Sequence, residues 1–281
     1  MTRLPASVLL AACLISLPAV SSGQDPQTPR RLRILVTNDD GYDAPGLAAL
    51  VDSLLPVADI TVVAPYEQQS GTGHGISFRD PIKIFKLGNP HGIPWYAVDA
   101  RPATVVRVAL FSLLDSLPDL VVAGINSGNN IGTNAWLSGT VAAARAAALW
   151  GLPGVAFSVD MDGPNPYHFS AGWARQTIEQ LIAQERITAP LLLNVNLQAN
   201  EPLGIRVAPM SLVTGEQGYD RRMSPGGQDY VWAEWLAPED DPREGTDLYW
   251  YSRGYVTITP LVIDQTDSPE ILEMQRLFNR P

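Results

Sequence analysis

The sequence predicts an α/β fold built on a parallel sheet, for two reasons. Short, β-branched-rich apolar runs alternate with helical patterns along the chain, and polar turn residues follow several of these runs. The first unit is a strand at 33–37, a helix opened by Ala44-Pro45-Gly46 and a strand at 60–64. A strand, a helix and a strand of this length form a βαβ unit, which joins parallel strands by a right-handed crossover.

The remaining elements are predicted from hydrophobic periodicity and from turn residues. The first helix carries an apolar stripe at helical spacing: Leu47, Leu50, Val51, Leu54 and Leu55. Further strands are predicted at 78–87 and 95–98, with a hairpin as their expected pairing, and at 120–123, 155–159, 191–197, 205–213 and 255–261. Further helices are predicted at 101–114, from Ser138 or Thr140 to 149, at 171–183 and at 268–278.

The chain divides into four segments on composition. A signal peptide is expected at 1–23, a linker at 24–31, the α/β core at 32–200 and a C-terminal region at 201–281. Within the last segment, residues 214–244 are rich in Gly, Pro and charge and carry alternating Tyr and Trp. This pattern favours an exposed hairpin or an oligomer contact, and stacking of these rings on a nucleobase is an alternative.

The first 23 residues have the pattern of an export signal. Arg3 is followed by an apolar run and then by Ser21-Ser22-Gly23. The run is too short and too weakly flanked for a membrane anchor, so we expect no stable membrane span. Leu10-Ala11-Ala12-Cys13 resembles a lipoprotein cleavage box, but apolar sequence continues past Cys13, which favours ordinary cleavage over lipid anchoring. We therefore expect an exported, periplasmic protein.

Composition excludes several classes of function. Cys13 is the only cysteine, so after cleavage a disulfide framework, a thiolate nucleophile and a cysteine zinc site are all ruled out. The formal net charge of -10 argues against a protein that coats a nucleic-acid polymer, which should be basic. A single nucleotide held through a metal ion remains compatible with this charge.

An acidic pair stands at the end of the first strand, in Asn38-Asp39-Asp40-Gly41. Two carboxylates about 4 Å apart repel by roughly 4 kcal/mol at an effective dielectric near 20, so one must protonate, turn into water or share a cation. Both can converge only where the strand ends and turns, at Gly41. Because carboxylate oxygen is the ligand that hard cations prefer, we predict a Mg or Mn site here.

Three further polar stretches could complete this site. A glycine-rich loop at 66–77 follows the second strand, where ligands bind in open α/β sheets, although a flexible surface loop would look the same. Asn126 follows the strand at 120–123 and could face Asp39 and Asp40, although asparagines are also common turn residues. The alanine-rich helix after Ser138 could hold a phosphate at its start. A helix terminus stabilises a bound anion by only about 0.3–2 kcal/mol, so a cation must neutralise most of the charge of the phosphate.

In this order and spacing, the motifs resemble the SurE survival-protein family of metal-dependent 5'-nucleotidases, also described as nucleoside monophosphate phosphatases. The resemblance runs from residue 33 to about residue 264. The motifs are Asn38-Asp39-Asp40-Gly41, Ala44-Pro45-Gly46, Ala64-Pro65 with Ser70-Gly71, Gly124-Ile125-Asn126 with Gly128 and Asn130, Ser138-Gly139-Thr140 with the following Val141-Ala142-Ala143-Ala144, and Gly254-Tyr255-Val256-Thr257-Ile258-Thr259-Pro260-Leu261.

The resemblance implies a Rossmann-like three-layer αβα core with a mostly parallel sheet. It also implies a C-terminal hairpin or tail exchanged within a homodimer or tetramer. One divalent metal per subunit, Mg or Mn, would be ligated by Asp39, Asp40, Ser70 and Asn126. The substrate would contact Gly71, Asn130, Ser138, Gly139 and Thr140.

The implied activity is hydrolysis of nucleoside 5'-monophosphates, with 3' esters left open, to nucleoside and phosphate. Catalysis is expected from Asp39, Asp40, Asn130, Ser138, Gly139 and Thr140, with either acid as general base or covalent phosphoryl acceptor. His74 is a candidate proton donor. Two alternatives are an exported nucleotide-binding protein without turnover and a serine esterase, although the chain has no Gly-x-Ser-x-Gly elbow.

Two features depart from the family pattern. Asp43 stands where bacterial relatives often carry histidine, and this extra acid would either tighten metal binding or hinder an anionic substrate. The export signal is unusual for a family generally regarded as cytoplasmic.

Overall fold

The computed structural model describes residues 30–163 and 165–279. The predicted signal peptide at 1–23 therefore lies outside the described residues, as does the linker apart from Arg30 and Arg31. The described residues from Arg31 onwards form one compact unit, and the fold below is that of this unit. Among the residues described, no helix combines the length and the apolar character needed to cross a membrane.

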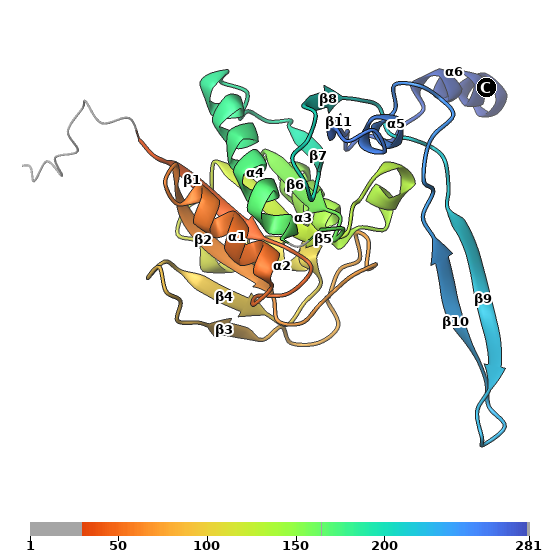
Figure 1. The fold of residues 1–281 in the computed structure, drawn as a ribbon, viewed down its shortest axis with the longest axis horizontal. Coiled ribbons are helices and arrows are strands. Elements are labelled where there is room, and N and C mark those ends of the chain that lie inside the picture. The colour runs from red at the N-terminus through yellow and green to blue at the C-terminus, as the bar shows by residue number, and fades with distance from the viewer. Residues whose placement is uncertain (1–29, 164, 280–281) are drawn as a thin grey trace, which may run out of the picture. The chain divides into compact units, whose positions relative to one another are not determined.

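The predicted α/β class is confirmed, because the described residues form a mostly parallel, nine-stranded sheet with helices on its faces (Figure 1). The sheet order is β3-β4-β2-β1-β5-β6-β7-β11-β8, and only the pairs β3–β4 and β7–β11 are antiparallel. Its strands are β1 (Leu32–Thr37), β2 (Ala58–Pro65), β3 (Ile84–Lys86), β4 (Trp95–Val98), β5 (Leu120–Ser127), β6 (Gly154–Val159), β7 (Leu192–Leu197), β8 (Ile205–Val207) and β11 (Val256–Pro260).

The helices that cover the sheet follow its strands along the chain. They are α1 (Pro45–Leu54), α2 (Pro102–Val108), α3 (Gly139–Leu149) and α4 (Pro166–Ala183), with a short 3-10 helix at Gly132–Trp136 ahead of α3. The C-terminal region adds α5 (Asp247–Tyr251) and α6 (Ser268–Phe278).

Alternation of side chains along β1 shows how the three layers form. Ile34 and Val36 pack into one apolar cluster with α1 and α4, whereas Leu35 points to the other face and packs with α2 and α3. Successive strand residues face opposite sides of a sheet, so one short apolar strand contributes to both clusters. Figure 1 shows α1 and α4 together over one face of the sheet. The predicted Rossmann-like, three-layer architecture is confirmed.

Two predicted strands are shorter than the sequence suggested. The prediction for 78–87 is wrong except at β3, and that for 205–213 is wrong except at β8. Pro81 and Pro209 explain the difference, because proline donates no backbone hydrogen bond to a sheet ladder. The predicted hairpin is confirmed, since β3 pairs with β4 in antiparallel register.

Two helical segments also differ from prediction. The helix predicted at 101–114 is α-helical only as far as Val108 and continues as a π-helical turn at Ala109–Leu113. Helix α5 was not predicted from the sequence. Its Thr246 hydroxyl accepts from the Tyr249 amide at 3.2 Å, a normal helix cap that was recognisable in Thr246-Asp247.

The C-terminal region does more than pack against the core. Strands β8 and β11 join the main sheet beyond β7, so residues on both sides of position 200 share one sheet. The predicted hairpin is present as β9 (Glu216–Met223) and β10 (Asp229–Leu236), which pair only with each other among the described strands. Figure 1 shows this hairpin extending away from the sheet.

Candidate active site

The turn after β1 is fixed by Asn38 and Gly41. The Asn38 side chain donates from Nδ2 to the Gly41 carbonyl at 2.8 Å and accepts from the Gly41 amide at 3.3 Å. Gly41 has a φ of 114°, a backbone conformation that side chains with a Cβ rarely adopt. The Asn-Asp-Asp-Gly sequence therefore forms a tight turn that places the two acids at the carboxyl edge of the sheet.

Asp39 is a buried carboxylate with a single described side-chain partner. It is only 3% exposed, and Oδ1 accepts a hydrogen bond from the Thr140 hydroxyl of α3. Burial, together with the neighbouring charge of Asp40, raises the pKa of Asp39 to about 7, although the Thr140 bond acts in the opposite direction. Burial therefore contributes more than the charge of Asp40 to the raised pKa of Asp39.

Asp40 lies beside Asp39 but is held by the next strand. Its carboxylate accepts from the Ser127 amide at 2.9 Å and from the Ser127 hydroxyl at 3.2 Å, at the end of β5. Because β5 pairs directly with β1, this bond confirms that polar residues at the two strand ends meet. Ser127 was not among the predicted site residues, although its neighbour Asn126 was.

A pocket of about 240 Å³ opens at this edge, and we call it the site pocket. Its lining includes Asp39, Ser70, Gly71, Asn126, Asn130 and Ser138, all of them predicted site residues, together with Asn129, Asn134 and Leu137, which were not predicted. Asn126 donates from Nδ2 to the Gly128 carbonyl at 2.6 Å, which leaves Oδ1, the atom able to ligate a cation, outside that bond.

The glycine-rich loop is tied to the acidic turn by the backbone. The Gln69 amide donates to the Asp39 carbonyl at 2.7 Å, and the Gly73 amide donates to the Leu137 carbonyl at 2.9 Å. These bonds place Ser70 and Gly71 over the pocket. His74, the candidate proton donor, does not line the pocket; burial and then Arg145 and Arg107 lower its pKa.

Asn130 is positioned by polar residues in the middle of the sheet. Its backbone amide donates to Asn196 Oδ1, and its side-chain Nδ2 donates to Ser158 Oγ. Its backbone carbonyl accepts from Asn194 Nδ2, and all three distances are 2.7 Å. These three partners are almost fully buried, so their polar groups hydrogen-bond to the Asn130 loop and are shielded from water. The alternation Asn194-Val195-Asn196 inside an apolar strand was the signal in the sequence.

The start of α3 brings Ser138, Gly139 and Thr140 against Asp39. Ser138 Oγ accepts from the Val141 amide at 3.1 Å, which confirms the predicted helix cap. A Cβ on Gly139 would lie 2.7 Å from both Cβ and Oδ2 of Asp39, so only glycine fits. Thr140 is fully buried with its hydroxyl given to Asp39, and a phosphate contact by this residue stays a prediction.

This arrangement has known relatives. The family model of the survival protein SurE matches residues 34–216, which include every residue placed in the site pocket. The chain belongs to the SurE family. The matched span ends within β9, so α5, β10 and β11 lie beyond it.

Individual SurE relatives align over most of the chain. The 5'-nucleotidase SurE of Rhodopirellula baltica is 40% identical over 254 residues, which cover 89% of this chain and 100% of that protein. The 5'-nucleotidase SurE 1 of Thermus thermophilus is 40% identical over 84% of this chain and 93% of its own. The crystal structure of the SurE protein from Aquifex aeolicus superposes with a TM-score of 0.75 at 30% identity, covering 87% and 99% of the two chains.

SurE proteins are in general metal-dependent, and the residues present suit a hard divalent cation. The site pocket presents a buried carboxylate, a hydroxyl and an amide oxygen, and no lysine, arginine or histidine is among the described residues that line it. Such oxygen donors match Mg or Mn better than softer metals. The described residues contain no group of three His, Cys, Asp or Glu able to hold a metal, and Ser70 and Asn126 offer neutral oxygens beside the carboxylate of Asp39.

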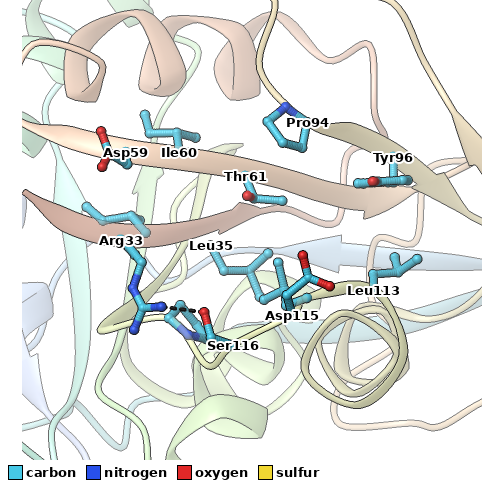
Figure 2. Close-up of a pocket in the computed structure, with 13 residues that line it drawn as sticks. Arg33, Leu35, Asp59, Ile60, Thr61, Pro94, Tyr96, Leu113, Asp115 and Ser116 are labelled. Atoms are coloured by element: carbon cyan, nitrogen blue, oxygen red, sulfur yellow. Dashed lines mark hydrogen bonds between the residues drawn. The ribbon is translucent and has the colours of Figure 1, made fainter. Parts of the chain in front are cut away.

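Another cavity lies at the opposite half of the strands and is not part of this site. It has a volume of about 390 Å³ and is lined by the amino halves of β1 and β2 and the segment after α2 (Figure 2). The Arg33 guanidinium there donates to the Ser116 hydroxyl (Figure 2). Ligands of open α/β sheets bind at the carboxyl ends of the strands, which favours the site pocket over this one.

Proposed function

We propose that this SurE-family chain is a metal-dependent phosphomonoesterase that hydrolyses nucleoside 5'-monophosphates to nucleoside and phosphate. The names of the relatives support this reaction, since they are 5'-nucleotidases at 38–40% identity over most of the chain. The observation that carries the proposal is the buried Asp39 carboxylate, which has Asp40 beside it and lines a pocket whose described residues include no basic side chain. A buried acid without a cationic partner is costly unless a cation binds it.

A divalent metal would be held by Asp39, Ser70 and Asn126 from the pocket and by Asp40 from its edge. When bound, Mg or Mn supplies Lewis-acid polarisation of the phosphoryl group and lowers the pKa of a coordinated water. The chain's own groups do the rest. Ser127 orients the Asp40 carboxylate, which can take a proton from the attacking water. The backbone amide of Thr140, in the first turn of α3, hydrogen-bonds to the Asp39 carboxyl group, and the start of this helix would stabilise developing negative charge.

A phosphate-release assay tests this proposal directly. Purified protein is incubated with adenosine 5'-monophosphate in the presence of Mn, and again with a chelator, and free phosphate is measured. We expect turnover with Mn and none with chelator. Tight nucleotide binding without phosphate release would instead support an exported nucleotide-binding protein, and release that resists chelator but stops with an organophosphate would support a serine esterase.

The raised pKa of Asp39 predicts a pH dependence of metal binding. Asp39 has a pKa of about 7 in the metal-free protein and must lose its proton to ligate, so protons compete with the metal below that pH. Affinity for Mn should therefore rise about tenfold per pH unit up to about pH 7 and level off above it. Calorimetry in buffers of different ionisation enthalpy should count about one proton released per metal near pH 6 and almost none near pH 8. An affinity that does not change across this range would contradict the assignment.

We also propose that the protein is exported to the periplasm and acts as a homodimer or tetramer. The N-terminal pattern supports export. The exposed β9–β10 hairpin and α6 support an oligomer, because α6 has no buried residue while Leu272, Leu277 and Phe278 are exposed.

A further inference from the structure

A second pocket adjoins the site pocket, and we call it the neighbouring pocket. Its volume is about 440 Å³, within the range of about 300–1,000 Å³ that small-molecule sites occupy. Asn129 and Asn134 line both pockets, so the two lie next to each other at these residues. The cavity shown in Figure 2 and the one beside Phe78 and Arg101 share no lining residue with the site pocket.

Part of the wall of the neighbouring pocket comes from the C-terminal region. Val213, ahead of β9, and Pro238, after β10, line one side, and Leu248 and Tyr251 of α5 line another. Ile131, Leu248 and Tyr251 form a small apolar cluster against which Val213 packs. The pocket therefore combines an apolar wall with polar groups, which is the usual composition of a small-molecule site.

The charged groups of this pocket are all acidic. Asp160, Asp162 and Glu239 line it, and no lysine, arginine or histidine appears among its described lining residues. Asp160 is held in place, because Oδ1 accepts from Asn129 Nδ2 at 2.7 Å and Oδ2 lies 3.0 Å from the Tyr251 hydroxyl. Asp162 and Glu239 are exposed, so their carboxylates are free to accept hydrogen bonds from a ligand.

We infer that the neighbouring pocket receives the leaving group of the substrate and selects an uncharged nucleoside over a leaving group that carries further negative charge. The inference rests on the proposed function, in which the phosphoryl group occupies the site pocket. Ribose hydroxyls and base amino groups are donors that match Asp162 and Glu239, and the base can pack on Val213 and Pro238. A second phosphate on the leaving group would meet like charges without any compensating cation.

Competition between two matched substrates tests this selection. Adenosine 5'-monophosphate and adenosine 3',5'-bisphosphate differ only by a phosphate on the leaving group, and Mn is kept in excess over both. We expect kcat/KM to favour the monophosphate by about tenfold or more, and the Asp162→Asn/Glu239→Gln variant to reduce that preference about fivefold. High salt should also reduce the preference of the unmodified protein, because the two carboxylates are exposed and screened.

A control variant separates this effect from general loss of charge. Asp115→Asn/Glu185→Gln removes the same two charges, but Asp115 precedes β5 and Glu185 follows α4, at the far edge of the sheet. Its preference should equal that of the unmodified protein. If both nucleotides are hydrolysed and neither the double variant nor salt changes the preference, the inference is wrong while the proposed function stands. If neither nucleotide releases phosphate, the proposed function fails and the inference fails with it.

Discussion

Replacing Asp39 with Asn is expected to lower metal-dependent phosphate release by about three orders of magnitude. The amide keeps the shape of the side chain but removes the negative charge that would bind the cation. A metal ion lowers the activation free energy by several kcal/mol, and about 1.4 kcal/mol corresponds to a tenfold change in rate. The loss should appear in kcat/KM for adenosine 5'-monophosphate and as weaker Mn binding by calorimetry. Asp40→Asn should cause a comparable loss in activity, because Asp40 is placed to accept the proton of the attacking water.

The same Asp39 variant should not unfold the protein. Its carboxyl pKa is raised to about 7 in the folded, metal-free chain, so the stability it contributes is present at low pH and lost as pH rises towards 7. At about pH 8 the buried charge costs on the order of 4 kcal/mol in the metal-free protein. Asp39→Asn removes that cost, so its melting temperature near pH 8 without metal should be higher than that of the unmodified protein. Asp115→Asn, an exposed acid elsewhere, serves as the control for both activity and stability. If Asp39→Asn kept an activity close to that of the unmodified protein, Asp39 would not be a ligand of the catalytic cation and the proposed site would be wrong.

Replacing Gly139 with Ala is expected to lower activity by about a hundredfold. The added Cβ would lie 2.7 Å from Cβ and Oδ2 of Asp39, so the carboxylate or the start of α3 must move. A displacement of about 1 Å in a catalytic group can cost on the order of a hundredfold in rate. Mn affinity should fall together with kcat/KM, because the same carboxylate is displaced.

Gly172→Ala provides a matched control for this substitution. Gly172 lies in α4 and is exposed. Apart from its two chain neighbours and the nearby backbone of the same helix, no heavy atom would lie within 4 Å of a Cβ added there. Alanine should raise stability there by up to about 1 kcal/mol through helix propensity and leave activity unchanged. If Gly139→Ala retained the full kcat/KM of the Gly172→Ala control, the close approach of α3 to Asp39 would not matter for catalysis.

Local patterns were sufficient to predict the framework of this site. The strand before Asn38, the Gly41 turn and the cap at Ser138 are each determined by residues close together in the sequence. They therefore appear in the structure as expected, and the adjacency of β1 and β5 brings their polar ends together. The resemblance to the SurE family then predicted that these separate motifs form one metal and phosphate site.

Long-range partners could not be predicted in the same way. Ser127 binds Asp40 from 87 positions away, and Asn194 and Asn196 hold Asn130 from more than 60 positions away. The alternation Asn194-Val195-Asn196 marks an unusual strand, but local sequence does not show which distant residue such a side chain will bind. The same holds for Asp247, whose buried carboxylate accepts from the amides of Gly132 and Ser211 and so joins α5 to the loop beside the site.

The most direct test of the account is the position of manganese in crystals of the mature protein grown with Mn. Anomalous scattering should show one ion per subunit between Asp39, Ser70 and Asn126, with the Asp40 carboxylate at its edge. A map without a peak there, with the two carboxylates turned apart into solvent, would contradict the claim that this acidic turn exists to bind a catalytic cation.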